Sequence, residues 1–150
     1  MQSCWKVRDN MKPILFNYNR DRTCVHCINY HFVWFVKYRR KVLSPNIESR
    51  FLEVIRKIGE DKGFTVLNCK AYDQEHVDCY IAAPPKISPT QIVKYLKGIS
   101  GNILLREFPD LRDKLYRGEL WNGSYFVETI GSPSESELVR YTERQTDHQL

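Results

Sequence analysis

The sequence predicts one α/β (α+β) sandwich, in which helices pack on a single, mostly antiparallel sheet of about five strands. Three observations support this fold class. Runs of β-branched and aromatic residues recur along the chain, two stretches with helical apolar spacing each begin at a Ser-Pro pair, and the connections are short. A chain of 150 residues is long enough to bury one core without disulfides or metals as staples.

The first predicted strand is long and largely buried. Residues 24–37 form a nearly continuous run of aromatic and β-branched residues, which favours a strand. Residues 1–22 show no sustained periodicity, so we expect an N-terminal extension there and the folded domain over residues 23–150.

Two helices and a hairpin are expected next. Ser44-Pro45 predicts a helix start and Gly63 its end, and Ser88-Pro89 repeats the same start signal further along the chain. Between these helices, residues 64–71 and 76–83 predict two strands joined by a tight turn at 73–75. A further hairpin is expected over residues 120–130, because Asn122-Gly123 is a strong turn signal.

A short C-terminal helix is expected after residue 133. Ser134 and Glu137 form a capping box, which marks a helix start. Tyr141 and Gln145 are four residues apart, so this helix would present both side chains on one face.

The predicted strand at residues 76–83 carries a candidate metal site. His76 and Asp78 are two residues apart and so share one face of the strand, while Val77 and Cys79 face the core. Imidazole nitrogen and carboxylate oxygen are suitable ligands for Mg²⁺ or Mn²⁺, and the amide oxygen of Gln145 can add a third. If these faces meet, the phenol of Tyr141 lies beside the metal as a candidate nucleophile. Taken alone, a His-x-Asp pair is more often the solvated face of a sheet.

Basic and aromatic residues predict contacts with nucleic acid. Four of the five residues at 37–41 are cations, namely Lys37, Arg39, Arg40 and Lys41, within a chain of net charge +5. Such a cluster suits a phosphate backbone, although in an arbitrary protein a solvated turn after a strand is the commoner explanation. Tyr30 and Trp34 lie just upstream and are expected to stack on bases.

Composition restricts where the protein works. No apolar run approaches the roughly 18 residues that a membrane helix requires, and the first residues lack a secretory signal. We therefore expect a cytoplasmic protein with no membrane association. The five cysteines are expected to be reduced thiols, because Cys24 and Cys27 have no second pair with which to complete a zinc site.

Taken together, these segments resemble the single-tyrosine HUH transposases of small bacterial and archaeal insertion sequences, the TnpA-like proteins. The resemblance covers roughly residues 18–146. It rests on segments in the family's order: Asn29-Tyr30-His31-Phe32-Val33-Trp34, residues 37–43, His76-Val77-Asp78, residues 84–89, Leu96-Lys97-Gly98, Glu107-Phe108-Pro109, residues 120–126, and Tyr141-Thr142-Glu143-Arg144-Gln145.

The resemblance implies a function and a set of roles. A TnpA-like protein is a homodimer that binds single-stranded DNA with hairpin ends and cuts and rejoins strands through a 5′-phosphotyrosine. Tyr141 would be the nucleophile, and His76, Asp78 and Gln145 would hold a divalent metal, Mg²⁺ or Mn²⁺. The family has histidine where this chain has Asp78, a change that favours hard, oxygen-preferring metals.

Two other functions fit the same residues. One is a non-catalytic module that binds single-stranded DNA or RNA hairpins on an RRM-like sheet through aromatic stacking and basic side chains. The other is a metal-dependent nuclease in which water attacks and Tyr141 is only structural. A covalent DNA–protein adduct distinguishes the transposase from both.

Overall fold

The chain was studied as a computed structural model that describes residues 19–130. The predicted helix with Tyr141 and Gln145 lies outside these residues, as does nearly all of the predicted N-terminal extension. The domain boundaries 1–22 and 23–150 therefore stay a prediction.

Eleven short and long elements follow one another along the described chain. In order they are β1 (Asn19–Arg20), β2 (Val25–His26), β3 (Asn29–Phe35), a 3-10 turn (Lys37–Arg39), α2 (Pro45–Lys62), β4 (Thr65–Tyr72), β5 (His76–Ala82), α3 (Pro89–Glu107), α4 (Pro109–Asp113), a second 3-10 turn (Tyr116–Gly118) and β6 (Phe126–Ile130).

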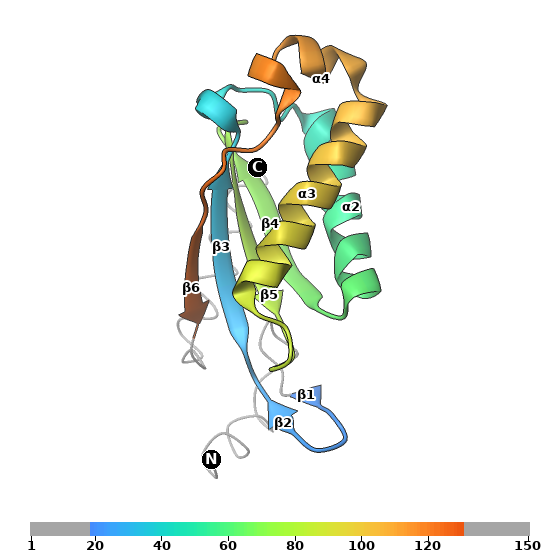
Figure 1. The fold of residues 1–150 in the computed structure, drawn as a ribbon, viewed down its shortest axis with the longest axis vertical. Coiled ribbons are helices and arrows are strands. Elements are labelled where there is room, and N and C mark those ends of the chain that lie inside the picture. The colour runs from blue at the N-terminus through green and yellow to red at the C-terminus, as the bar shows by residue number, and fades with distance from the viewer. Residues whose placement is uncertain (1–18, 131–150) are drawn as a thin grey trace.

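The main sheet has four strands in the order β4-β5-β3-β6, and every neighbouring pair is antiparallel (Figure 1). From β3 to β6 the elements run β-α-β-β-α-β, the split arrangement that brings the last strand beside the first. β1 and β2 form a separate two-stranded ribbon below the sheet. The predicted mixture of helices and antiparallel strands is thus confirmed.

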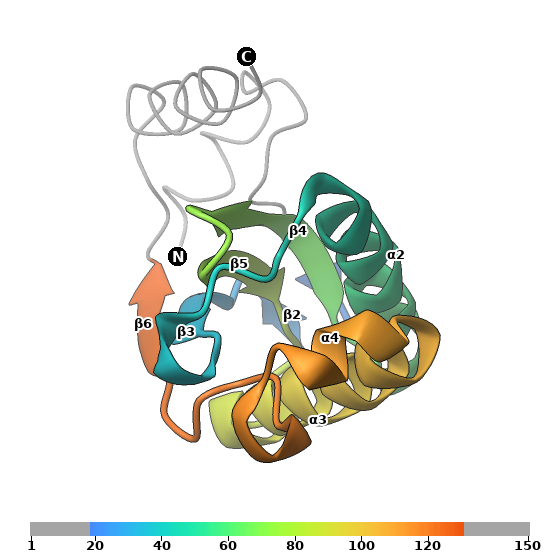
Figure 2. The same cartoon turned by 90° about the horizontal axis from the view of Figure 1, so that it is seen from above.

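Helices α2 and α3 cover one face of this sheet, as the view from above shows (Figure 2). The core lies between the two layers and is rich in aromatic rings. Trp34 is fully buried there, with its ring centroid 6.3 Å from that of Phe51 and 5.8 Å from that of Trp121. Phe32, Val77, Cys79 and Ile81 face the same layer from β3 and β5.

The helices begin and end where the sequence signals them. The Ser88 hydroxyl accepts a hydrogen bond from the backbone N–H of Gln91. In turn, the side-chain oxygen of Gln91 accepts a hydrogen bond from the backbone N–H of Ser88. α2 begins at Pro45 without a side-chain cap, since the proline itself is suited to the first turn. It ends at Gly63, whose φ of 89° is the left-handed conformation that glycine adopts without strain.

The predicted hairpin over residues 120–130 is wrong: β6 pairs with β3, and Trp121 makes only an isolated bridge to Val36. Within residues 19–130 the main sheet has four strands, so the predicted count of about five is not confirmed. The cause is tertiary, because Trp121 is anchored to α3: its indole N–H donates to the Ser100 hydroxyl at 3.0 Å.

Candidate active site

The predicted metal-ligand pair lies on the face of the sheet that no helix of residues 19–130 covers, here called the open face. Along β5, Val77 and Cys79 are fully buried, whereas the side chains of His76 and Asp78 are each 23% exposed. The alternation confirms that His76 and Asp78 share the face away from the helices. Nε2 of His76 and Oδ1 of Asp78 lie 3.9 Å apart, close enough for one small cation to contact both.

Aromatic rings hold His76 in place from both neighbouring strands. Tyr72 of β4 and Phe35 of β3 are its partners across the sheet. The Tyr72 ring is stacked 5.4 Å from the imidazole at 17°, and the Phe35 ring lies 5.0 Å away on the other side. The Nδ1 atom is buried and has no hydrogen-bond partner among the described residues. The ring is therefore oriented by packing.

Asp78 has a second histidine beside it, which the sequence did not reveal. Nε2 of His31 lies 3.4 Å from Oδ2 of Asp78, and Nδ1 of the same ring lies 2.8 Å from Oε1 of Glu128 on β6. Burial alone would lower the pKa of His31, but the neighbouring carboxylates of Asp78 and Glu128 outweigh it and raise that pKa above 6.5. The imidazole thus lies between two acids.

The turn between β4 and β5 offers His76 a second set of neighbours. Ligand atoms of Asp73, Glu75 and His76 lie within 4.8 Å of one another. Asp73 is exposed and Glu75 half-buried. His76 thus belongs to two arrangements, one with Asp78 on the sheet face and one with the turn carboxylates.

Both arrangements fit a hard divalent cation by their donor chemistry. Each combines imidazole nitrogen with carboxylate oxygen, the ligand types that Mg²⁺ and Mn²⁺ accept. The buried, partnerless Nδ1 and the packed ring of His76 leave Nε2 as the nitrogen facing Asp78. Gln145, the third predicted ligand, and Tyr141, the predicted nucleophile, lie outside the described residues.

A basic and aromatic groove begins beside His76. It encloses about 480 Å³ and is lined by Phe35, Lys37, Tyr38, Arg39, Asn122 and Ser124. The Arg39 guanidinium lies 4.5 Å from the centroid of Phe35, the ring that also packs on His76. Tyr38 is 65% exposed. The groove thus joins stacking and cationic groups to the open face of the sheet.

The predicted cations differ in their surroundings. Lys37 forms an ion pair with Glu119, and Arg39 lies over Phe35. Arg40 and Lys41 are exposed. A further lysine, Lys97 of α3, donates to the backbone carbonyls of Asn122 and Ser124 and so holds the loop that forms one wall of the groove.

The prediction that Trp34 stacks on bases is wrong. Its side chain is fully buried between α2 and the sheet, so no base can reach it. Tyr30 lies on the same, helix-facing side of β3, where it packs at the edge of the core with its ring 5.9 Å from Phe32. Alternation along β3 gives the open face to His31, Val33 and Phe35 instead.

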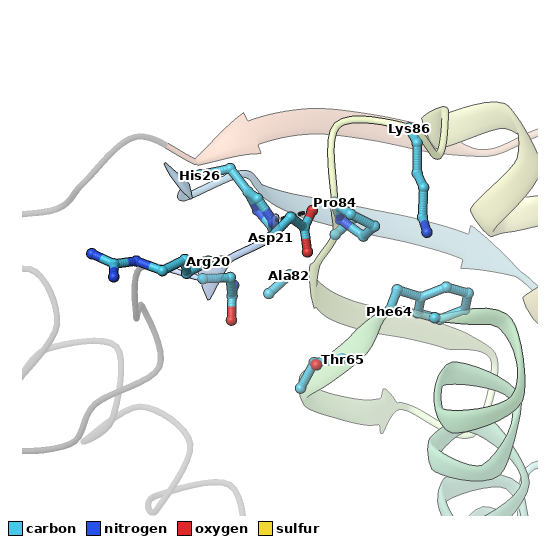
Figure 3. Close-up of a pocket in the computed structure, with 11 residues that line it drawn as sticks. Arg20, Asp21, His26, Phe64, Thr65, Ala82, Pro84 and Lys86 are labelled. Atoms are coloured by element: carbon cyan, nitrogen blue, oxygen red, sulfur yellow. Dashed lines mark hydrogen bonds and ion pairs between the residues drawn. The ribbon is translucent and has the colours of Figure 1, made fainter. Parts of the chain in front are cut away.

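A separate pocket of about 260 Å³ lies at the other end of β5 (Figure 3). In this pocket Nε2 of His26 lies 3.1 Å from Oδ2 of Asp21, and the side chain of Lys86 points toward Phe64. Within residues 19–130, neither Cys24 nor Cys27 joins a group of potential metal ligands, and both are free thiols. Of the helices in that span, none combines the length and apolarity needed to cross a membrane.

Comparison with known proteins agrees with this geometry. The IS200-like transposase family matches residues 24–145. The chain is 31% identical over 128 residues to the ISDra2 transposase TnpA of Deinococcus radiodurans, covering 85% of this chain and 91% of that protein. It is 30% identical over 118 residues to the transposase of insertion sequence IS200 of Salmonella typhimurium, covering 79% and 76% of the two chains.

Solved structures show the same fold. A crystal structure of a candidate transposase from Deinococcus radiodurans superposes with a TM-score of 0.70 at 28% identity, covering 85% of this chain and 97% of that one. A REP-associated tyrosine transposase bound to a REP hairpin superposes with a TM-score of 0.52 at 14% identity, covering 79% and 66%. With a family match over most of its length and relatives of this similarity, the chain belongs to the IS200-like transposases.

Proposed function

We propose that this transposase binds single-stranded DNA with hairpin ends and cuts and rejoins it through a covalent link to Tyr141. The observation that carries the proposal is the His76–Asp78 pair, 3.9 Å apart on the open face of the sheet and next to a basic, aromatic groove. A pair of metal ligands beside a basic groove suits phosphodiester chemistry, in which a metal stabilises the charge that develops on the phosphate.

In this proposal His76, Asp78 and Gln145 hold a Mg²⁺ or Mn²⁺ ion, which would polarise the scissile phosphate and stabilise its developing charge. The phenol oxygen of Tyr141 attacks phosphorus, and the bond from phosphorus to the 3′ oxygen breaks. The phenol proton passes to water, the departing 3′ oxygen takes up a proton from water to become a hydroxyl, and the 5′ phosphate stays on the tyrosine. Attack by another 3′ hydroxyl reverses the step and restores the phenol without an energy source.

The groove positions the strand. The guanidinium of Arg39 and the exposed cations Arg40 and Lys41 provide charge for the phosphates, and the exposed ring of Tyr38 provides a stacking surface. Because Phe35 touches both Arg39 and His76, a phosphate held in the groove lies close to the metal ligands. We propose a homodimer as the working form, in which the helix predicted after residue 133 completes the partner's site.

The decisive experiment asks whether DNA becomes attached to the protein. The chain is incubated with hairpin-bearing single-stranded DNA and Mn²⁺, and the products are separated on a denaturing gel. An adduct that Tyr141→Phe abolishes, with hairpin binding retained, supports the proposal. Cut DNA without an adduct indicates a hydrolytic nuclease, and intact bound DNA indicates a binding module.

A second experiment decides which carboxylates act with His76. Asp78→Asn keeps the shape of the side chain and removes its charge, so the Mn²⁺ concentration needed for adduct formation should rise. The matched control is the double variant Asp73→Asn, Glu75→Gln, which removes the charge of the turn instead. The proposal requires the first variant to change the metal dependence and the second to leave it alone.

Substitution by the family's residue is informative too. Asp78→His should stay active and shift preference from Mg²⁺ toward Co²⁺ or Ni²⁺, which favour nitrogen ligands. Adduct formation is measured against metal concentration for the wild type, Asp78→Asn and Asp78→His. If the three curves superimpose, Asp78 is not a metal ligand.

A further inference from the structure

We infer that His31, anchored by Glu128, is a positioning residue that fixes the carboxylate of Asp78 for metal binding. The inference rests on the proposed function and adds two residues to it, neither of which holds the metal or touches the DNA. The two residues would set the orientation of the Asp78 carboxylate.

Three adjacent strands bring these groups into line. Cross-strand pairing places Glu128 of β6 opposite His31 of β3, and His31 opposite Tyr80 of β5, two residues beyond Asp78. The imidazole spans the gap between the two acids, at 2.8 Å from Glu128 and 3.4 Å from Asp78. Its side chain is only 14% exposed, so water competes little for either nitrogen.

Packing leaves the His31 ring little freedom to rotate. Its face stacks on the ring of Tyr80, with centroids 4.3 Å apart and planes within 2°. The edge of Phe126 approaches it at 6.2 Å. The hydrogen bond from Nδ1 to Glu128 also prevents the imidazole from turning within its own plane, so Nε2 faces Asp78.

The two oxygens of Asp78 are divided between two histidines. Oδ1 faces His76 at 3.9 Å, and Oδ2 faces His31 at 3.4 Å. A carboxylate held at one oxygen presents the other to a metal in a fixed direction, and groups that hold ligands in this way affect metal affinity strongly. The 3.4 Å separation is that of an ion pair, and Nε2 has no aligned hydrogen bond among the described residues.

Asp78 is flanked on its other side by a residue of β4. It pairs across the sheet with Lys70, whose buried Nζ has no hydrogen-bond partner in the described part of the chain. Side chains from both neighbouring strands thus enclose the carboxylate of Asp78.

The test measures Mn²⁺ binding directly, by electron paramagnetic resonance of the free ion, with the full chain and no DNA. His31→Ala should weaken the apparent Kd about 10–100-fold. His31→Gln places an amide N–H near the position of Nε2 and should recover much of the affinity. The matched control is His31→Asn, whose shorter amide can replace only Nδ1 and should not recover the Mn²⁺ affinity. An unchanged Kd in His31→Ala, or equal recovery by both amides, would overturn the inference.

A double-mutant cycle separates an effect on Asp78 from general support of the fold. In an Asp78→Asn background, His31→Ala should cause no further loss of Mn²⁺ affinity, because the carboxylate that His31 orients is already absent. An equal weakening in both backgrounds would overturn the inference. Glu128→Gln should weaken Mn²⁺ binding less than His31→Ala does. It weakens the contact between residue 128 and His31 but keeps the imidazole beside Asp78.

The proposed function is judged separately by the adduct on DNA. A wild-type chain that forms the adduct, with Mn²⁺ affinity indifferent to His31, rejects only the positioning role. A chain that binds Mn²⁺ in a His31-dependent manner but forms no adduct rejects only the transesterification.

Discussion

His76 is held by aromatic rings, and this decides how it can act. With Tyr72 stacked on one side and Phe35 packed on the other, the imidazole loses little entropy when a ligand binds, because its orientation is already set. The same packing joins it to the groove, since Phe35 also carries the Arg39 guanidinium. One phenylalanine thus contacts both the proposed metal ligand His76 and the proposed DNA-binding groove.

Trp34 is a structural residue, and its substitution should show this. Trp34→Ala opens a cavity in the core and should lower the free energy of unfolding by about 3–5 kcal/mol. Trp34→Phe should recover most of that stability, because the ring returns and the indole N–H it removes has no hydrogen-bond partner among the described residues. Chemical denaturation gives both values.

The DNA affinity of these variants provides the contrast. Trp34→Phe should bind hairpin DNA as the wild type does, whereas Tyr38→Ala should bind more weakly and unfold within about 1 kcal/mol of the wild type. Weaker binding by a stable Trp34→Phe protein would restore Trp34 to the interface.

Sequence reasoning located His76 and Asp78 because alternation along one strand fixes which residues share a face. It failed at Trp34 because a continuous apolar run has no alternation to distinguish the two faces. It missed His31 and Glu128 because their contact depends on which strands pair, and pairing joins segments far apart in the chain. The one local signal was a histidine inside an aromatic strand.

At the scale of elements, α2 and α3 are joined to each other and to the sheet at defined points. Arg50 of α2 donates two hydrogen bonds to Glu107 at the end of α3, at 2.8 and 2.9 Å. Gly59 lets α2 approach the start of β4: a Cβ there would lie 2.7 Å from the carbonyl oxygen of Phe64. Both contacts set how the helical layer lies on the sheet.

Two glycines in these helices should respond oppositely to the same change. Gly59→Ala should lower the free energy of unfolding by about 1–3 kcal/mol, because backbone must shift to admit the methyl group. Gly98→Ala in α3 is the matched control, with nothing within 4 Å of its Cβ, and should raise stability by about 0.5–1 kcal/mol. Thermal unfolding of both measures the difference, and a neutral Gly59→Ala would mean that the close approach is absent.

The Arg50–Glu107 pair should make stability depend on acidity. Hydrogen bonding to Arg50 lowers the pKa of Glu107 below 4.5 in the folded protein. Its stabilising contribution is therefore fully present above 4.5 and is lost as the pH falls through the lowered folded pKa. The difference in Tm between wild type and Glu107→Gln should be constant above 4.5 and shrink below it. A small, salt-sensitive effect is expected because the pair is at the surface.

Helix ends were predictable because their signals are local: Ser-Pro starts and a terminal glycine act within one turn. The hairpin at 120–130 was not. Asn122-Gly123 suits a tight turn, but Trp121 bonding to Ser100 and Lys97 holding the loop carbonyls override it. The partner of β6 is instead the strand at the start of the fold.

Across the whole molecule, the two hollows lie at opposite ends of the sheet. The groove with Arg39 adjoins the start of β5, and the pocket with His26 adjoins its end. The exposed cations Arg40 and Lys41 lie near the first. Cations line both hollows, since Arg20 and Lys86 lie at the pocket as Lys37 and Arg39 lie at the groove, and the exposed Arg40 and Lys41 follow the groove cations directly in the chain.

Salt dependence should report this distribution. Changing Arg39, Arg40 and Lys41 together to Gln should weaken binding to single-stranded DNA of any sequence. The slope of log K against log salt should flatten by about 0.7 for each phosphate that the variant no longer neutralises. Fluorescence anisotropy over a salt series gives the slope.

A triple variant of α2 supplies the control with the same change of charge. Arg56, Lys57 and Lys62 are exposed on α2, and none of them lines the groove. Changing all three to Gln should leave the slope nearly unchanged. Equal effects of the two triple variants would mean that net charge, and not the groove, governs binding.

The strand order has a consequence for how the protein is made. β6 is the last strand of the sheet to leave the ribosome, yet it pairs with β3, among the first to be synthesised. A chain that ends before β6 lacks Glu128, so His31 has no anchor in it. If His31 positions Asp78 as inferred, the proposed metal site reaches its final geometry only after β6 has joined the sheet.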